Sequence, residues 1–214
     1  MNRRVPSFPA ALLVFVLAAA GLVHGCLPTA TPPTRFYALS AAPADAGSPD
    51  FGIGRFPSVE VVPVRVPQYL DRPQIVTRSG PHRLELAEFD QWAGNLRKNM
   101  TRVIVENLSV RLRTADVRIA PSRAAVPADV RVEVEVLQFE RCEDRRVRLG
   151  AQWVLTVRND PSSAAVRITR LQSRRLPGAP DYTSTVSAMS DLLAELSEAI
   201  ARAVTRSLAK GPGA

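Results

Sequence analysis

The segment VRVEVEV, residues 130–136, decides the fold class. Valine occupies every second position and charged residues stand between, which is the pattern of a strand with one buried and one exposed face. The same alternation recurs over residues 147–157 and 165–171, with a turn around Asp160-Pro161 between them. Three consecutive strands with short connections predict an antiparallel meander.

Two amphipathic helices are predicted, one on each side of this meander in the chain. Residues 182–208 place apolar side chains at helical spacing along one face and basic residues near the end. Upstream, a stripe from Phe89 to Val110 steps by three and four residues. This stripe predicts a helix of about 25 residues that begins near Ala87.

Shorter β-segments precede the first helix. Residues 34–39 and 58–66 read as strands, and residues 74–78 and 83–86 read as a hairpin. The order β, β, ββ, α, βββ, α predicts an α/β (α+β) domain over residues 34–209. We expect two layers: one twisted, mostly antiparallel sheet with two long amphipathic helices on one face.

The N-terminus has the features of an export signal. Arg3 and Arg4 precede the apolar residues 10–23, a stretch shorter than the roughly 20 residues that a membrane-spanning helix needs. Val23-His24-Gly25-Cys26 then resembles the bacterial lipoprotein processing box. The resemblance implies a lipoprotein signal peptide over residues 1–25, and Cys26 as the acylated first mature residue, with palmitate among its acyl groups.

Residues 26–33 are rich in Pro, Thr and Ala and read as a tether. Leu27 follows the cysteine, and by resemblance to enteric lipoproteins this implies sorting to the outer membrane, facing the periplasm. Cleavage at an ordinary secretory site and retention as an inner-membrane anchor are the alternatives. Acylation of Cys26 would leave Cys142 without a partner, so we expect no disulfide.

Composition restricts the function. A chain of 214 residues with 46% apolar content can bury one core and is short for two domains. The net charge is +8, yet Lys98 and Lys210 are the only lysines, and the arginines form no nucleic-acid-binding motif. We therefore expect no nucleic-acid partner.

Catalytic signatures are missing from the sequence. There is no Gly-x-Ser-x-Gly elbow, no glycine-rich phosphate loop and no His-Glu-x-x-His motif. After signal cleavage His82 would be the one remaining histidine, in a predicted turn. We expect a protein that is not an enzyme and that has no cofactor and no metal site.

Two surfaces are candidates for binding. The segment PQYLDRP, residues 67–73, presents Tyr69, Leu70, Asp71 and Arg72 in a loop flanked by prolines. Aromatic residues and arginines in such loops often anchor interfaces. Alternatively, Tyr69 and Leu70 cover the sheet edge while Asp71 and Arg72 cap neighbouring elements. Residues 141–175 hold nine arginines against three acids, and either face lipid phosphates or an acidic partner, or form a solvated sheet face.

Four segments of the chain resemble a known family. They are residues 33–39 (PTRFYAL), 67–80 (PQYLDRPQIVTRSG), 84–108 and 182–208. Together they resemble the ABC-type transport auxiliary lipoproteins, the PqiC/YmbA-like group of membrane integrity-associated transporter subunits. Residues 139–180 match this pattern only loosely, so the arginine-rich segment gains no support from it.

The resemblance implies a non-catalytic outer-membrane lipoprotein of an MCE-type lipid transport system, with a periplasmic MCE-domain protein as its partner. The Tyr69–Arg72 loop would dock that partner, and a homo-oligomeric ring is an arrangement known in such families. Two alternatives remain open. One is an envelope-assembly accessory lipoprotein of the lipopolysaccharide-assembly type, and the other is a periplasmic lipid-binding carrier with an apolar cavity between sheet and helices.

Overall fold

The computed structural model describes residues 31–43, 56–124, 126–158, 160–174 and 182–209. The predicted signal peptide, Cys26 and most of the tether lie outside these residues. From Thr34 onward the described residues belong to a single unit. None of the described helices is long and apolar enough to cross a membrane.

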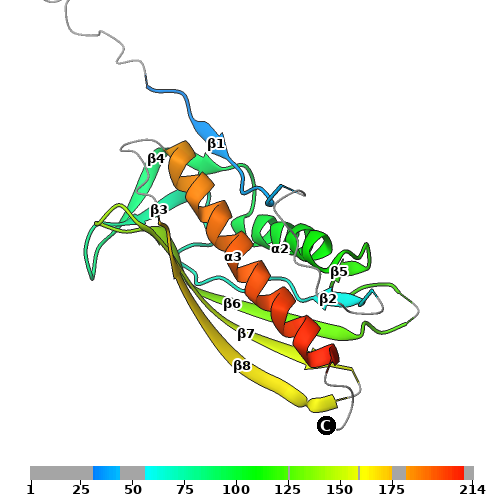
Figure 1. Cartoon of the computed structure of the whole chain (residues 1–214). Coiled ribbons are helices and arrows are strands. Elements are labelled where there is room, and N and C mark those ends of the chain that lie inside the picture. Colours follow the sequence, from blue (N-terminus) through cyan, green and yellow to red (C-terminus); the bar gives the residue numbers. More distant parts are fainter. Residues whose placement is uncertain (1–30, 44–55, 125, 159, 175–181, 210–214) are drawn as a thin grey trace, which may run out of the picture. The chain divides into compact units, whose positions relative to one another are not determined.

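The predicted meander is confirmed as three long antiparallel strands. They are β6 (Val130–Arg141), β7 (Val147–Val157) and β8 (Asp160–Gln172). They form a curled layer along which α3 runs (Figure 1). The register pairs Val134 with Trp153 and Trp153 with Arg167. As the alternation predicts, one face of β6 carries four buried valines, Val130, Val132, Val134 and Val136.

Five further strands complete a mixed, eight-stranded sheet. They are β1 (Arg35–Tyr37), β2 (Val59–Val61), β3 (Gln74–Arg78), β4 (Leu84–Trp92) and β5 (Val117–Ile119). β2 lies between β5 and β6 and is parallel to both, while β1 is parallel to β4. β3 is antiparallel to β4 and parallel to β6. The fold is thus α+β as predicted, with antiparallel long pairings and parallel short ones.

The first helix begins later than the sequence pattern predicts. α2 spans Leu96–Leu112, and residues 84–92 form β4, so the predicted start near Ala87 is wrong. β4 pairs with β1 on one side and β3 on the other, and this tertiary pairing overrides a stripe that fits a helix by spacing alone. Gly94, with φ +110°, then turns the chain, and Asn95 Oδ1 caps the helix by accepting from Lys98 N at 3.0 Å.

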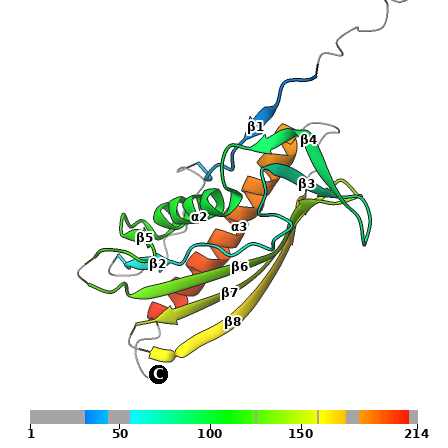
Figure 2. The ribbon, with the colours of Figure 1, turned by 180° about the vertical axis from the view of Figure 1, so that it is seen from behind.

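The core lies between the helices and the sheet. α3 (Tyr182–Ala209) crosses the meander with α2 packed beside it, as both ribbon views show (Figure 2). The largest buried side chains come from both layers, among them Phe139, Leu149, Leu155, Met100, Ile104, Met189 and Leu192. Buried Asn107 joins the helices by donating from Nδ2 to Ser197 Oγ at 3.4 Å. This packing covers one sheet face and leaves the opposite face of β6–β8 outward.

Candidate functional site: the 67–73 loop and its surroundings

The 67–73 loop is a tight turn between β2 and β3. Leu70 N donates to Pro67 O at 2.9 Å, and Asp71 N donates to Gln68 O at 3.2 Å. At the end of the loop, Pro73 O accepts from Trp92 N at 2.7 Å. The loop is therefore bound to itself and to the end of β4.

The four predicted binding residues are contiguous but point in different directions. Tyr69 is half-buried and Leu70 is buried in the core, whereas Asp71 is exposed and Arg72 is half-buried. Asp71 Oδ1 accepts from Asn95 Nδ2 at 3.0 Å, so the loop also contacts the start of α2. Asp71 is thus the member of the set that a partner could reach most directly, while Arg72 is half-buried and its Nε atom is buried.

A buried carboxylate, Glu140, holds the loop from beneath. Its side chain is 0% exposed. Its Oε2 accepts from Tyr69 Oη at 2.8 Å, and its Oε1 accepts from Arg78 Nε at 2.8 Å and from Gln138 Nε2 at 3.0 Å. A buried charge is tolerable when it is paired and its oxygens are hydrogen-bonded, as here.

Sequence reasoning missed Glu140, because regular alternation from the valines of β6 puts position 140 on the core face. A β-bulge between Val136 and Gln138 reverses the faces, so that Phe139 enters the core and Glu140 turns outward under Tyr69. The apolar Phe139 at an odd position, after valines at even positions, is the sequence signal that could have revealed this reversal.

The network perturbs the titration of its members. Burial, and then the adjacent Glu140 carboxylate, raise the pKa of Tyr69 well above its usual range. The hydrogen bond to Glu140 is the main cause that raises the pKa of Arg78. Burial also raises the pKa of the free thiol of Cys142, which lies near the same carboxylate.

We predict an alkaline loss of stability that depends on Tyr69. Its folded pKa lies above its unfolded value of about 10, so its stabilising contribution is complete below that pH and is lost as the pH rises further. Urea unfolding between about pH 8 and pH 11 should show a steeper decline for the wild type than for Tyr69→Phe, which has no phenol to titrate. Parallel declines would contradict the prediction.

The arginine-rich segment does not present one face. Arg167 stacks on Trp153 at 5.2 Å on the side of the sheet that faces the helices, and Arg141 stacks on Tyr182 at 5.3 Å. Arg148 and Arg170 lie on the opposite face. Arg175 lies outside the described residues. Several of these arginines therefore serve internal packing, and only a subset is directed at a common exterior surface.

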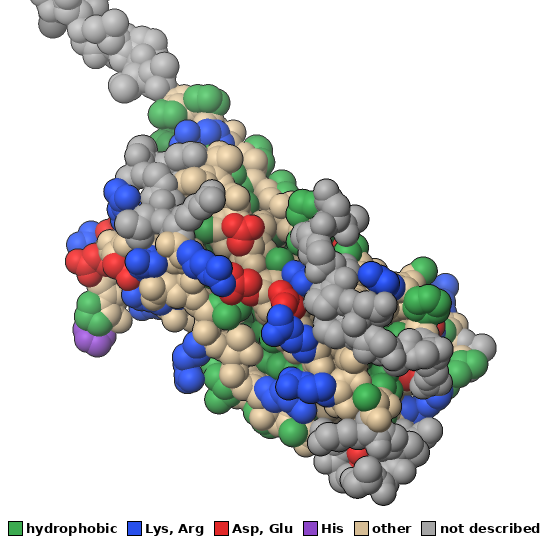
Figure 3. All heavy atoms as spheres, viewed as in Figure 1, with side chains coloured by type: hydrophobic (Ala, Val, Ile, Leu, Met, Phe, Trp, Pro, Cys, Tyr) green, Lys and Arg blue, Asp and Glu red, His purple; other side chains and the backbone are tan. Residues whose placement is uncertain are grey.

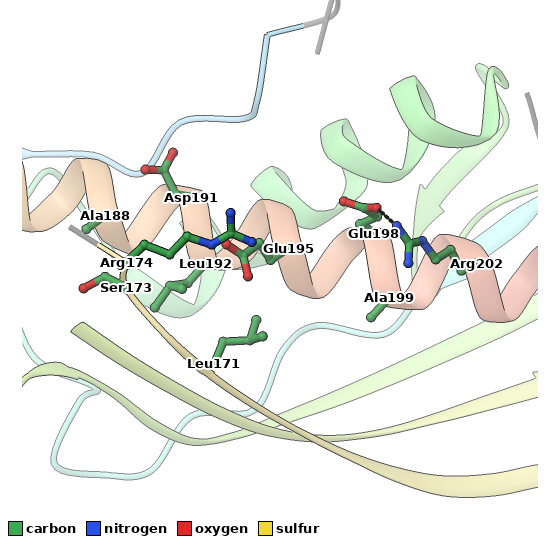
Figure 4. Close-up of a pocket in the computed structure, with 10 residues that line it drawn as sticks. All are labelled: Leu171, Ser173, Arg174, Ala188, Asp191, Leu192, Glu195, Glu198, Ala199 and Arg202. Carbon is green, nitrogen blue, oxygen red and sulfur yellow. Dashed lines mark hydrogen bonds and ion pairs between the residues drawn. The ribbon is translucent and has the colours of Figure 1, made fainter. Parts of the chain in front are cut away.

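A groove of about 700 Å³ runs between α3 and the edge strand β8 (Figure 4). Leu171 and Leu192 form an apolar floor, and the rim carries acidic and basic side chains. Glu198 pairs with Arg202 in this rim, and also with Arg111 at 3.4 Å. Acidic and basic side chains also lie next to each other near the centre of the face that carries α3 (Figure 3). This groove therefore offers no dominant charge to a ligand.

Reactive groups are sparse in the described part of the chain. No cluster of three or more His, Cys, Asp or Glu side chains there could hold a metal ion. His82 is exposed in the turn between β3 and β4, and Cys142 is buried.

Comparison with protein families gives one match that covers most of the chain. The model of the ABC-type transport auxiliary lipoprotein component matches residues 37–201. None of the curated proteins compared with the chain matches it.

Two solved structures share the fold. The crystal structure of an uncharacterized protein has a TM-score of 0.65 at 21% identity, over 81% of this chain and 99% of that one. Protein XCC0632 from Xanthomonas campestris, which bears the family name DUF330, has a TM-score of 0.65 at 16% identity, over 83% and 99%. At these identities the likeness concerns the fold alone.

Proposed function

Because the chain belongs to the family of ABC-type transport auxiliary lipoprotein components, we propose that it is the outer-membrane lipoprotein subunit of an MCE-type lipid transport system. Family membership makes it an auxiliary, lipid-anchored envelope component of a transporter. Beyond family membership, the proposal specifies that the transport system is of the MCE type, that the membrane is the outer membrane and that the partner is a periplasmic MCE-domain protein. In it, the protein performs no catalysis and docks a periplasmic MCE-domain protein during lipid movement between envelope membranes.

The observation that carries this proposal is the fixed conformation of the 67–73 loop. Its backbone is hydrogen-bonded to itself and to β4, and Tyr69 fastens it to buried Glu140 at 2.8 Å. A loop that is ordered before binding loses little conformational entropy when it binds. Asp71 and Arg72 would contact the partner, while Tyr69 and Leu70 would hold them in position.

The anchor in this proposal is Cys26. Acylation there would place a tether of residues 26–33 between the membrane and the domain, which would face the periplasm. Several acyl chains together hold a protein stably on a bilayer, at about 0.8 kcal/mol for each buried methylene. The processing-box motif and the lipoprotein family both support this assignment. A homo-oligomeric ring stays a prediction, for which the mass of the detergent-solubilised protein is the test.

The docking prediction is tested by exchanging charges in the loop. In Asp71→Arg/Arg72→Glu, recovery of an MCE-domain protein after crosslinking in intact envelopes should fall about tenfold, because central interface residues often carry that much binding energy. Arg83→Glu/Glu85→Arg is the matched control, since it exchanges an exposed ion pair at the start of β4. Its recovery should equal that of the wild type.

Two outcomes would overturn parts of this account. Equal recovery in the loop variant and the control would remove the loop from the interface. Recovery of a β-barrel protein in place of an MCE-domain protein would favour the envelope-assembly alternative. The lipid-binding carrier would instead require transfer of lipid by the protein without a partner.

A further inference from the structure

A hollow of about 660 Å³ lies on the outward face of the sheet, beside the 67–73 loop. Residues of β3, β6, β7, β8 and the loop line it, including Tyr69 and Gln138. Gly150 is at its centre, because the register pairs this residue with Gln138 on one side and Arg170 on the other. Gly150 is itself buried, and a Cβ there would lie in ordinary contact with Gln138 Cβ at 3.5 Å, so the floor of the hollow is closely packed at this point.

Three arginines line the hollow, and no acidic residue does. Arg78 is fixed from below by Glu140, and its Nη1 donates to Pro81 O at 3.3 Å. Arg148 donates from Nη2 to Asp144 at 2.5 Å and from Nε to Gln172 Oε1 at 3.2 Å. Arg78 and Arg148 are thus held in place by contacts that leave other guanidinium donors for a ligand.

Arg170 is the charge that the surroundings leave uncompensated. It is exposed, and within the described ranges its side chain makes no ion pair or hydrogen bond. Guanidinium groups match the geometry of phosphate oxygens and bind them through paired hydrogen bonds. The end of the hollow between Arg148 and Arg170 is therefore suited to a phosphate group.

An apolar strip continues from this cationic end along the same sheet face. Ile168 and Val166 alternate with Arg170 on β8 and are 53% and 60% exposed, and Leu137 on β6 is 45% exposed. Leu137 Cβ lies 3.9 Å from the position that a Cβ on Gly150 would take, so it borders the hollow directly. Exposed apolar side chains grouped beside a charged site often mark a ligand surface.

From this juxtaposition we propose that the hollow binds one molecule of an anionic phospholipid. The phosphate lies between Arg148 and Arg170, with Arg78 at its edge, and an acyl chain lies along Leu137, Ile168 and Val166. A free phosphate or an acidic peptide would satisfy the arginines but would leave the apolar strip exposed. The proposal concerns this face of the sheet and does not depend on the MCE-domain partner.

Photolabelling of the full chain tests the proposal. The protein in non-ionic detergent is irradiated with phosphatidylglycerol that carries a diazirine on its acyl chain, and the labelled residues are mapped by mass spectrometry. Label should appear on β8 around Val166–Ile168 and on β6 at Leu137. Arg170→Gln should reduce it at least about fivefold, because a charge-assisted contact is lost. Arg131→Gln, on the same face of β6, is the matched control and should keep the full label.

A second variant tests the hollow without changing charge. In Gly150→Leu the new Cβ would contact Gln138 Cβ at 3.5 Å, an ordinary distance, and the remaining side chain would fill the space. The label should fall as it does in Arg170→Gln, while the circular dichroism spectrum stays unchanged. If Gly150→Leu fails to fold, the label in Arg170→Gln still decides the proposal, because Arg170 is exposed and its substitution should not disturb folding.

Four results would overturn the proposal. The first is equal label in Arg170→Gln and the wild type. The second is equal label from a neutral diazirine diacylglycerol, which would exclude headgroup recognition. The third is complete competition by millimolar inorganic phosphate, which would indicate a site for free phosphate. The fourth is complete competition by an acidic peptide, which would indicate a protein partner.

Discussion

Replacing Glu140 by alanine should lower the free energy of unfolding by about 3 kcal/mol, because it leaves a largely buried cation without its partner. The Arg78 side chain is 26% exposed, so it would lose the carboxylate without full access to water. Tyr69 Oη would lose its acceptor at the same time. Urea unfolding monitored by circular dichroism measures the change. Glu135→Ala removes an exposed carboxylate from the same strand and should change stability by less than about 0.5 kcal/mol.

A combined variant separates the loss of the pair from the loss of packing. In Glu140→Met/Arg78→Met/Tyr69→Phe, no charged or hydroxyl group of the network remains unpaired, although Gln138 Nε2 and Phe139 N lose an acceptor, so stability should recover part of the way toward the wild type. A loss in the combined variant as large as in Glu140→Ala would show that the network acts through shape and not through its charges. Alkylation of Cys142 gives a second readout, since its Sγ lies 3.8 Å from Gln138 Nε2 in the same network.

Leu70→Ala should lower the free energy of unfolding by about 3 kcal/mol, which is typical of a truncated core leucine. The side chain is 2% exposed although it belongs to a surface loop, so its removal leaves a cavity beneath the loop. Thermal unfolding monitored by circular dichroism measures the loss. Leu86→Ala removes a leucine that is 48% exposed and should lie within about 0.5 kcal/mol of the wild type.

This prediction affects how docking data are read. A lower recovery of partner with Leu70→Ala would reflect partial unfolding as well as any lost contact. Substitution of Asp71 reduces this ambiguity, because its side chain is exposed, whereas the Nε atom of Arg72 is buried. Equal stability of Leu70→Ala and Leu86→Ala would mean that the loop leucine is not the packing anchor that its burial indicates.

Periodicity predicted the elements whose structure is decided locally. The meander of β6, β7 and β8 and the helix α3 were readable from alternating or helical spacing. β4 was readable only at its start: residues 84–86 were predicted as a hairpin strand opposite β3, whereas residues 87–92 fit a helical stripe, and their pairing with β1 and β3 makes them a strand. β5 has three residues and depends on its neighbour β2. The spacing of apolar residues in the sequence does not predict such pairings.

The candidate site was predicted in position more than in detail. The prolines and polar residues of 67–73 indicated a loop, and the structure has a turn there. Tyr69 turns toward the sheet because its hydroxyl donates to Glu140, which lies 71 residues further along the chain. Glu140 lies on the sheet face away from the helices only because of the bulge in β6. The hollow at Gly150 depends on the register of three strands. Both features follow from long-range pairing that single-sequence patterns do not contain.

The end of β4 joins the segment after the tether to the 67–73 loop, which has a mechanical consequence. Ala93 N donates to Tyr37 O at 2.7 Å, and the adjacent Trp92 N donates to Pro73 O at 2.7 Å. Tyr37 Oη also donates to Asp90 Oδ1 at 2.8 Å. Tension applied through the chain ahead of β1 would therefore be borne first by β4 and passed within two residues to the loop, which transmits it to β6 through Tyr69 and Glu140.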